Sequence, residues 1–400
     1  MNYTGFNMSS IKTANRSSVL YLLNSGEQLS RKDIAEKLGL TPAAVSKICA
    51  ELIAEGAIAE CGISGEGGGA GRKKIILSLN SKSLFVLALN IDKKGFYAAL
   101  CTIDGKEQIG ERFFFENDCS PEECLRFAGK KCRELIEKSK ISKEKIIGTG
   151  VGIVGGADSE NGVTAGNYGI WKPGVPVRRI LEEELTMPVA VENNVKSFAI
   201  ASLIFDRRDT DESILFVKWG PGVGSAIVVG SAVLGKADSD SSEIGHYIAV
   251  PNGEECRCKR RGCLETVISS DAIVERVERK YGKKNLTALS ERSDINGNKT
   301  EILDILSAFS KEQTIREEIE SCTKLLSKAV TNAAAVIAPD VVITFGYMFT
   351  DEVFKVFEAE CRALYPGFKN GCFRLSRLDK KHNYIGPAAV AAKSFFFERK

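Results

Sequence analysis

One histidine and three cysteines lie close together in the middle of the chain. His246 is followed by Cys256, Cys258 and Cys263. One imidazole and three thiolates make a Cys₃His set, which suits tetrahedral zinc and leaves no coordination position for water. Isolated cysteines are more often small apolar packing residues, but three in so short a span follow no helix or strand stripe. The spacing therefore predicts a structural Zn²⁺ site.

Two carboxylates, Glu243 and Glu265, flank this cluster. A closed Cys₃His site has no room for them as ligands. We call the segment from His246 to Cys263 the zinc loop. We therefore expect this loop to hold both carboxylates in place and to direct them at another ligand. Gly253 and Gly262 fall where a chain wrapped around a metal needs tight turns.

The composition bounds the class of protein. A chain of 400 residues is long enough for more than one domain. Its 55 Lys and Arg nearly balance 52 Asp and Glu, for a formal net charge of +3. The net charge of the protein therefore does not indicate whether its partner is nucleic acid, membrane or protein. The N-terminus lacks a basic-then-apolar signal segment, and no apolar run is long enough to span a bilayer. We expect a cytoplasmic protein without membrane insertion, whose cysteines are reduced and available for metal.

The first 80 residues carry local signals for two consecutive helices. Residues 1–15 are polar and are expected to be loose. Ser30 and Asp33 have the spacing of a capping box, which begins a helix that a glycine ends. Thr41 then caps the next helix, with a proline in its first turn. Apolar residues recur along this second helix at helical spacing, namely Val45, Ile48, Cys49, Leu52 and Ile53.

A strand pair follows, with a short strand at 57–61, a glycine-rich tip at 62–71 and a returning strand at 72–79. Two helices joined by a glycine-containing turn, and then a hairpin with a basic tip, predict a winged helix-turn-helix that binds DNA. A small helical subdomain that binds protein is the alternative. Lysines and arginines would contact phosphates, and small polar residues would face bases. The residues expected to face DNA are Arg31, Thr41, Pro42, Ala43, Ser46, Lys47, Arg72 and Lys73.

Beyond a linker at 81–85, a strand–hairpin–strand pattern occurs twice. In the first copy, an apolar strand that ends at Asp92 turns back into a second strand at 96–102. In the second copy, a strand at 213–219 passes through the turn Gly220–Gly224 into a strand at 225–229. Helices and further strands follow each copy. The duplication predicts two α/β lobes with a cleft between them, an architecture like that of sugar kinases and actin.

With these features, the whole chain resembles the ROK family, in the branch where a winged helix-turn-helix precedes a sugar-kinase-like domain. The resemblance rests on GLTPAAVSKICAELIAEGAI, GVGIVGGAD, VENNVKSFAIAS, EIGH with the cysteine cluster, GCLET and IGPAAVAAK. One departure is Lys259, which stands where the family's zinc motif usually has a glycine after the second cysteine.

The resemblance implies an α/β fold. A winged helix-turn-helix at 1–80 would precede a two-lobed, actin-like and sugar-kinase-like (ribonuclease H-like) ROK domain at 86–400. The smaller lobe would span about 86–193 with a C-terminal helix at about 385–400, and the larger lobe about 194–384.

The resemblance also implies a sugar site. Amides and carboxylates give the paired donors and acceptors that vicinal hydroxyls need. A histidine that binds metal through one nitrogen can donate its other N–H to a hydroxyl. Asparagines alone can equally be turn residues. The positions that match the family's sugar contacts are Asn167, Asn193, Asn194, Glu243, His246 and Glu265.

Several family kinase features are replaced. Asn194 stands where family kinases have the catalytic base Asp, and an amide cannot take a proton. The first phosphate loop reads Asp92-Lys93-Lys94-Gly95-Phe96 in place of Asp-x-Gly-Gly-Thr. Pro221 removes one N–H from the second loop, and Tyr347 replaces one glycine of a pair. These changes predict no catalytic residue, no ATP or Mg²⁺ and no enzyme activity.

The expected function is a sugar-responsive transcriptional regulator, a repressor of carbohydrate uptake or catabolism genes. A homodimer, or a tetramer, would bind a pseudo-palindromic operator, with a sugar or sugar phosphate as effector and zinc as structural cofactor. Two alternatives remain: an active ATP-dependent carbohydrate kinase with an appended DNA-binding domain, and a regulator whose effector is a protein.

Overall fold

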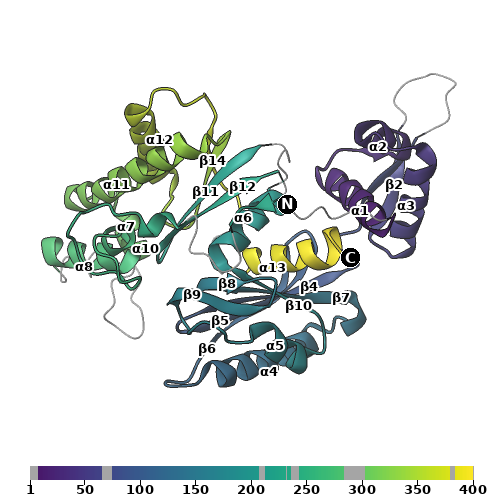
Figure 1. Cartoon of the computed structure of the whole chain (residues 1–400), viewed down its shortest axis with the longest axis horizontal. Helices are drawn as coiled ribbons and strands as arrows, with labels where there is room; N and C mark the ends of the chain where they lie inside the picture. The colour runs from purple at the N-terminus through teal and green to yellow at the C-terminus, as the bar shows by residue number, and fades with distance from the viewer. Residues whose placement is uncertain are drawn as a thin grey trace. The chain divides into compact units, whose positions relative to one another are not determined.

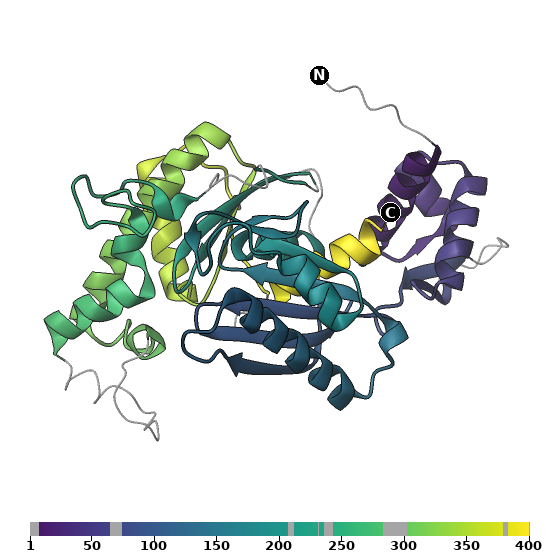
Figure 2. The ribbon, with the colours of Figure 1, turned by 60° about the horizontal axis from the view of Figure 1, so that its bottom comes forward.

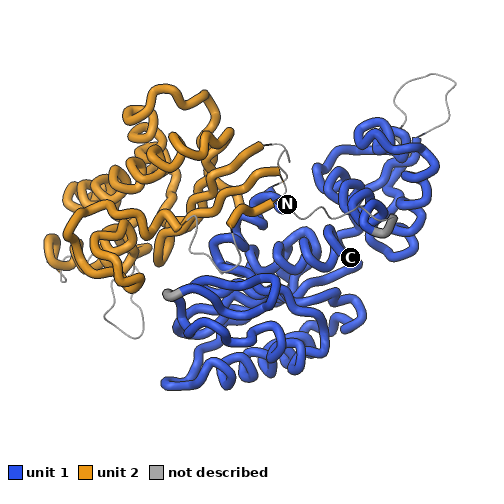
Figure 3. The backbone as a smooth tube through the Cα atoms, in the orientation of Figure 1, with its two compact units in different colours: residues 1–209, 382–400 blue, residues 210–381 orange. Residues whose placement is uncertain are grey.

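The computed structural model describes residues 8–64, 74–206, 212–230, 232–235, 243–282, 302–378 and 383–399. The chain divides into two compact units, with residues 1–209 and 382–400 in unit 1 and residues 210–381 in unit 2 (Figure 3). The helix at 194–205 therefore belongs to unit 1, whereas the sequence places the start of the larger lobe at about residue 194. No helix of the described residues is long and apolar enough to cross a membrane.

The N-terminal domain is a winged helix-turn-helix within unit 1. Its strands form a three-stranded antiparallel sheet in the order β1-β3-β2. The tip between β2 and β3, with Arg72 and Lys73, lies outside the described residues. The elements are α1 (Met8–Asn24), β1 (Leu29–Ser30), α2 (Arg31–Leu38), α3 (Pro42–Ala54), β2 (Ile58–Ser64) and β3 (Lys74–Leu79).

Local caps fix α2 and α3 as the sequence predicts. Ser30 and Asp33 form a complete capping box at the start of α2, and Gly39 ends the helix in the left-handed conformation. The Thr41 hydroxyl accepts the Ala44 N–H at 3.2 Å and so caps α3. The expectation that residues 1–15 are loose is wrong for residues 8–15, which belong to α1.

The rest of unit 1 is a five-stranded sheet with helices on both faces. The strand order is β10-β7-β4-β5-β6, and β10, β7 and β4 run parallel. Helices α4 and α5 cover one face, and α6 and α13 lie on the other (Figure 1). The elements are β4 (Phe85–Asp92), β5 (Gly95–Thr102), β6 (Glu107–Phe114), α4 (Pro121–Ser139), η1 (Lys143–Lys145), β7 (Ile146–Ile153), β8 (Gly155–Asp158), β9 (Val163–Gly169), α5 (Val177–Leu185), β10 (Val189–Asn193), α6 (Asn194–Phe205) and α13 (Ile385–Ala392).

A glycine in β7 allows α13 to pack closely on the sheet. A Cβ on Gly150 would lie 1.9 Å from the Pro387 carbonyl oxygen, so no larger residue fits at this crossing. After α13, the π-helical turn Lys393–Phe397 reaches α1 (Figure 2). There the Tyr21 ring stacks on Phe397 with centroids 4.8 Å apart, and an Arg16 guanidinium N–H donates to the Phe396 carbonyl at 2.9 Å. The end of the chain is thus tied to the DNA-binding domain.

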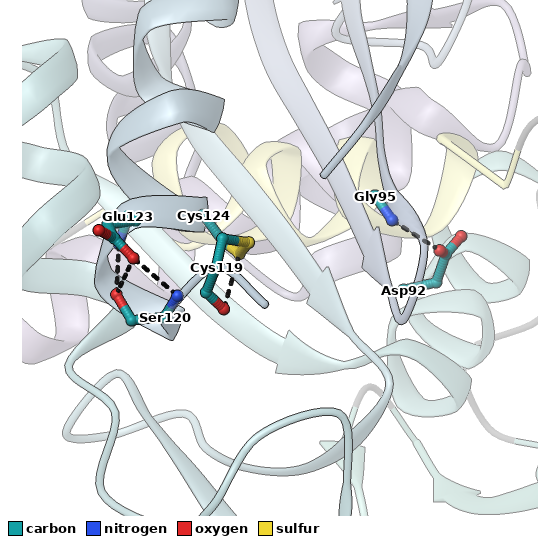
Figure 4. Close-up of a disulfide and its surroundings, with 6 residues drawn as sticks. All are labelled: Asp92, Gly95, Cys119, Ser120, Glu123 and Cys124. Atoms are coloured by element: carbon teal, nitrogen blue, oxygen red, sulfur yellow. Dashed lines mark hydrogen bonds between the residues drawn. A yellow bond between two sulfur atoms is a disulfide. The ribbon is translucent and has the colours of Figure 1, made fainter. Parts of the chain in front are cut away.

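A disulfide joins Cys119, just before α4, to Cys124 in its first turns (Figure 4). The expectation that all cysteines are reduced is therefore wrong for this pair, while the other ten are free. The reason is local, because Ser120 and Glu123 form a capping box that folds the chain back on itself. The two Cα atoms are consequently 6.1 Å apart, within disulfide reach.

Unit 2 is built on a second five-stranded sheet, in the order β13-β12-β11-β14-β15. As in unit 1, an antiparallel hairpin lies beside a parallel strand, so the predicted duplication is present. Leu215, Val217 and Trp219 point from β11 into the core beneath the helices. The elements are β11 (Ser213–Trp219), β12 (Val223–Val229), β13 (Ala232–Val233), η2 (Ile244–His246), α7 (Leu264–Ile268), α8 (Ser270–Tyr281), α10 (Ile302–Ser307), α11 (Gln313–Ile337), β14 (Val341–Phe345), α12 (Asp351–Leu364) and β15 (Phe373–Leu375).

Candidate zinc, sugar and DNA sites

The four predicted metal ligands converge in unit 2. The ligand atoms of His246, Cys256, Cys258 and Cys263 all lie within 4.8 Å of one another. His246 Nδ1 is 3.5 Å from Cys256 Sγ, and Cys258 Sγ is 3.5 Å from Cys263 Sγ. Tetrahedral zinc, with bonds of about 2.0–2.3 Å, needs ligand atoms roughly 3.6 Å apart. The donor set and its spacing therefore fit zinc.

Tight turns bring these ligands together. Gly262 adopts φ +74°, and a Cβ there would lie 1.7 Å from the Val250 carbonyl oxygen. Lys259 also has a left-handed φ of +68°, which favours glycine. This conformation explains why a glycine is usual in the family motif, and shows that the lysine keeps the turn. Burial alone would raise the pKa of the Cys258 thiol, but hydrogen bonds from the Arg260 side chain and backbone lower it to about 7.

The zinc loop positions Glu265 against the glycine-rich turn. Glu265 Oε1 is 2.8 Å from an Arg257 guanidinium nitrogen, and Oε2 accepts the Val223 N–H at 3.2 Å. Because a Cβ on Gly222 would lie 2.5 Å from Oε2, the carboxylate needs a glycine at this place. Glu243, partly buried, precedes η2, and its carbonyl accepts the His246 N–H at 2.9 Å. The sequence did not single out Arg257, whose role depends on this contact.

The turn Gly220–Gly224 is braced by neighbouring groups. The Gly220 N–H donates to the Gly222 carbonyl at 3.0 Å, and Pro221 has no N–H. The Ser270 hydroxyl donates to the Gly220 carbonyl at 2.7 Å and lies 2.8 Å from the Tyr347 hydroxyl. The Tyr347 ring lies 3.5 Å from where a Gly220 Cβ would be. Tyr347 thus occupies space directly beside the turn.

Lys218, one residue before Trp219 at the end of β11, is a charged group that sequence analysis did not single out. The residue is only 7% exposed, and its Nζ would lie 3.5 Å from a Cβ on Gly220. Burial lowers the pKa of this ammonium to about 8, although the nearby Glu265 carboxylate acts in the opposite direction. The sequence does contain a hint of this buried charge, because a lysine stands inside the otherwise apolar strand SILFVKW.

The sugar-site candidates of unit 1 lie on β9 and at the junction of β10 and α6. Asn193 is 6% exposed, and its amide oxygen accepts the N–H groups of Val195 and Lys196. Its amide N–H donates to the Gly155 carbonyl at 2.8 Å, so Asn193 serves as the cap of α6. Asn194 follows it, partly exposed. Asn167 lies on β9, and its side chain is outside the described residues.

Asp92, the retained residue of the first phosphate-loop segment, has partners within its own hairpin. One carboxylate oxygen accepts the N–H of Lys94 at 2.8 Å. The same oxygen accepts the N–H of Gly95 at 3.2 Å (Figure 4). The Arg112 guanidinium donates to the same oxygen at 2.8 Å. Asp92 therefore stabilises the turn between β4 and β5.

The predicted DNA-facing residues on α3 form one exposed face. Thr41, Pro42, Ala43, Ser46 and Lys47 are all exposed, while Val45, Ile48, Cys49 and Leu52 are buried beneath them. Arg31, at the start of α2, is partly exposed and donates to the Glu60 carboxylate at 2.9 Å. The helix thus presents small and polar side chains together with the exposed side chain of Lys47.

Known proteins share both parts of this architecture. Residues 88–394 match the ROK family, and residues 13–59 match a winged helix-turn-helix DNA-binding family. Over 388 residues the chain is 22% identical to the xylose repressor of Caldicellulosiruptor bescii, covering 95% of this chain and 96% of that protein. Over 350 residues it is 24% identical to the DNA-binding transcriptional dual regulator NagC of Escherichia coli, covering 85% of this chain and 82% of that protein.

Solved structures share the fold. A ROK family transcriptional regulator described as a homolog of the E. coli MLC protein has a TM-score of 0.75 and 21% identity, with 97% of each chain covered. A ROK family glucokinase from Streptomyces griseus, in complex with glucose and AMPPNP, has a TM-score of 0.65 and 18% identity, covering 78% of this chain and all of that one. The fold class expected from the sequence is confirmed. The protein belongs to the ROK family and carries an N-terminal winged helix-turn-helix.

Proposed function

We propose that this protein is a sugar-responsive transcriptional repressor of carbohydrate uptake or catabolism genes. The observation that carries the proposal is the joining of a DNA-binding helix with an open polar face to a ROK domain. Its relatives include a xylose repressor and NagC, both regulators by name. In the proposed mechanism, a homodimer places two copies of α3 on a pseudo-palindromic operator, since wings and helices bind half-sites in pairs.

The ROK domain would bind a sugar or sugar phosphate. Asn194, Glu243 and Glu265 offer amide and carboxylate groups for hydroxyls, with Asn167, Asn193 and His246 as further candidate contacts. Zinc bound by His246 and the three cysteines would fix the loop that positions Glu265. Within unit 1, the contacts of Tyr21 and Arg16 with residues 396–398 give a route from the ROK domain to α1.

Three features of the described residues support loss of kinase activity. Nucleotide phosphates bind to free backbone N–H groups of a glycine-rich turn. Here Pro221 lacks one, and the Val223 N–H is taken by the Glu265 carboxylate. Tyr347 fills space beside the turn. Asn194 cannot act as the base that accepts the proton of the sugar hydroxyl.

An active carbohydrate kinase with an appended DNA-binding domain is the second candidate. It is favoured by the retained Asp92, at the end of β4, and by the likeness in fold to a glucokinase solved with glucose and AMPPNP. Phosphoryl transfer needs a bound nucleotide and a base, so the two candidates differ in a measurable way.

Calorimetric titration of the zinc-loaded full chain separates them. Xylose, glucose, N-acetylglucosamine and their phosphates are titrated with and without Mg-ATP. We expect one of these compounds to bind alone, with no heat from ATP and no phosphorylated product. Turnover that Asp92→Asn abolishes would establish the kinase, and binding of none of the compounds would contradict the sugar-sensing role.

A further inference from the structure

A cavity of about 470 Å³ lies in unit 1 at the outer edge of its five-stranded sheet. Residues 188–192, most of them in the edge strand β10, form one wall, and Ile200 of α6 and Val390 of α13 line it as well. Small-molecule sites have volumes of roughly 300–1,000 Å³. The described residues that line this cavity include none of the candidate sugar contacts, so a ligand here would occupy a second site.

The hydrogen bonds of β10 show which of its backbone groups face the open edge. The Thr149 N–H donates to the Pro188 carbonyl at 2.9 Å, and Thr149 stands opposite Val189 in the register of β7 and β10. In a parallel pair, alternate residues of a strand bond to the neighbouring strand. The N–H and C=O groups of Val189 and Val191 therefore point away from β7.

The edge groups of Val189 have partners, whereas those of Val191 do not. The Glu182 carboxylate accepts the Val189 N–H at 3.0 Å, and the Arg178 guanidinium donates to the Val189 carbonyl at 3.0 Å. In the part of the chain that the structure describes, no loop or side chain bonds to the N–H or C=O of Val191.

Val191 presents this backbone pair to the cavity. The residue is only 2% exposed, and its side chain packs in the core with α4 and α5, so its backbone is the part that lines the cavity. Buried backbone groups without partners are rare. A ligand with one acceptor and one donor would satisfy both groups.

Two partly buried carboxylates, Glu182 and Glu192, also line the cavity. Glu192 accepts the Ser159 hydroxyl at 2.9 Å and a backbone N–H at 2.8 Å. Within the described residues, both carboxylates accept hydrogen bonds from neutral groups only. Burial raises the pKa of Glu192, although the fields of Lys196 and Lys393 act in the opposite direction. An ammonium group from a ligand would give these carboxylates a direct charged partner.

The two cations of the lining have partners of their own. Arg178 donates to three main-chain carbonyls, and Lys393 lies 3.8 Å from the Glu398 carboxylate. Glu398 in turn accepts the Tyr21 hydroxyl of α1 at 3.0 Å. Because Lys393 and Glu398 both line the cavity, a ligand there would contact the segment that is tied to the DNA-binding domain.

We propose that this cavity binds a small ligand with an ammonium group beside an amide, that is, an amino-acid amide or a short peptide, and that it is a second effector site. The amide would pair with the N–H and C=O of Val191, and the ammonium would bind Glu192 or Glu182. Ile200 and Val390 suit an aliphatic side chain. Binding at this site needs residues of unit 1 alone and goes beyond the proposed sugar-sensing function.

Calorimetric titration of the full chain tests the ligand class. The probes are L-leucinamide, leucyl-glycinamide, N-acetyl-L-leucinamide, which lacks the ammonium, and isoamylamine, which lacks the amide. Hydrogen bonds to charged groups change affinity by roughly tenfold to a hundredfold. We expect leucinamide or leucyl-glycinamide to bind, and the two incomplete probes to bind at least about tenfold more weakly. No binding of either complete probe, or equal binding of the incomplete ones, would overturn the proposal.

Two variants locate the site. Glu192→Gln keeps the shape and an acceptor for Ser159 but removes the charge, so it should weaken leucinamide at least about tenfold. Ala190→Phe places a large side chain on the wall of the cavity and should abolish binding. Glu137→Gln, at an exposed position on α4, is the matched control and should change nothing. Thermal unfolding checks that each variant is folded, and unchanged affinity in a folded Glu192→Gln would overturn the site.

The effector role is tested on DNA, and this readout rests on the proposed DNA-binding function. Saturating leucinamide should change affinity for the selected DNA site at least about fivefold. Tyr21→Phe keeps the ring that stacks on Phe397 but removes the bond to Glu398, so it should bind leucinamide normally and lose this effect. Bound leucinamide that leaves DNA affinity unchanged would overturn the effector role. No sugar is used in these measurements, so failure here leaves the sugar sensor standing.

Discussion

Glu265 connects two parts of unit 2 through a single carboxylate. One oxygen pairs with Arg257 in the zinc loop, and the other accepts the Val223 N–H in the glycine-rich turn. The side chain can do both only because Gly222 has no Cβ. We therefore expect a change in the loop that carries the metal ligands to reach the glycine-rich turn. Zinc held by these four candidate ligands would then affect the turn as well as the folding of the loop.

The zinc loop can be tested with Cys258→Ser, which removes one proposed ligand. We expect zinc content to fall from one ion per chain to well below it. The Tm of unit 2 should fall by roughly 5–10 °C. Loss of a structural metal lowers the free energy of unfolding by several kcal/mol, and each kcal/mol lowers the Tm by roughly 2–4 °C in a domain of this size. Metal analysis and thermal unfolding measure both effects.

Cys61→Ser is the matched control, because Cys61 is exposed and lies in the DNA-binding domain. It should leave zinc content and Tm unchanged. Full zinc occupancy in Cys258→Ser, or complete chelation of the unmodified protein without a change in Tm or sugar affinity, would refute the structural zinc site.

At the scale of the element, α3 combines an end fixed by local sequence with a face fixed by packing. Thr41 caps the helix, and its apolar stripe is buried in the domain, which leaves Ser46 and Lys47 exposed. We expect this single exposed lysine of α3 to contact a phosphate. Its loss should weaken binding to all DNA sequences alike.

For Lys47→Ala we expect operator affinity to fall by roughly threefold to tenfold, with the slope of log affinity against log salt reduced by about one. Anisotropy titrations at several salt concentrations measure this. Lys311→Ala, in unit 2, should change neither quantity. An unchanged salt slope in Lys47→Ala would show that α3 does not face the DNA backbone.

The same elements show what sequence can and cannot predict. The ends of α2 and α3 were predictable because Ser30, Asp33 and Thr41 act on neighbouring backbone groups. The first half of α1 was not, because its residues have no apolar stripe. It is instead stabilised by distant partners, with ion pairs from Lys12 to Glu51 and from Arg16 to Glu55.

The candidate site also has a part that the sequence predicts and a part that depends on distant contacts. The four metal ligands are close in sequence, so their residue types and spacing sufficed. The contacts of Arg257, Lys218 and Tyr347 join the loop of the metal ligands, β11 and the segment after β14. The sequence shows a lysine within an apolar strand and a tyrosine in place of a glycine, but not which groups these side chains meet. The Cys119–Cys124 disulfide was missed because cysteine spacing alone does not define a pairing.

At the scale of the whole molecule, the DNA-binding domain is joined to the ROK domain by more than the chain connection. The Asn24 side-chain amide donates to the Ile204 carbonyl at the end of α6 at 2.6 Å. The Tyr21 hydroxyl donates to the Glu398 carboxylate at 3.0 Å, and burial raises the pKa of Tyr21 well above its ordinary value. These contacts link α1 to two helices of the ROK domain, so a ligand that shifts either helix can change how the domain is held.

The central claim is that sugar binding and DNA binding are linked, and one titration tests it most directly. The full chain is first used to select its binding site from a random DNA pool. Its affinity for that DNA is then measured by fluorescence anisotropy, with and without a saturating sugar or sugar phosphate that the calorimetry has identified. We predict at least about a tenfold loss of DNA affinity, and an equal loss of sugar affinity when DNA is bound, because linkage is reciprocal. A sugar that binds tightly and leaves DNA affinity unchanged would contradict the account.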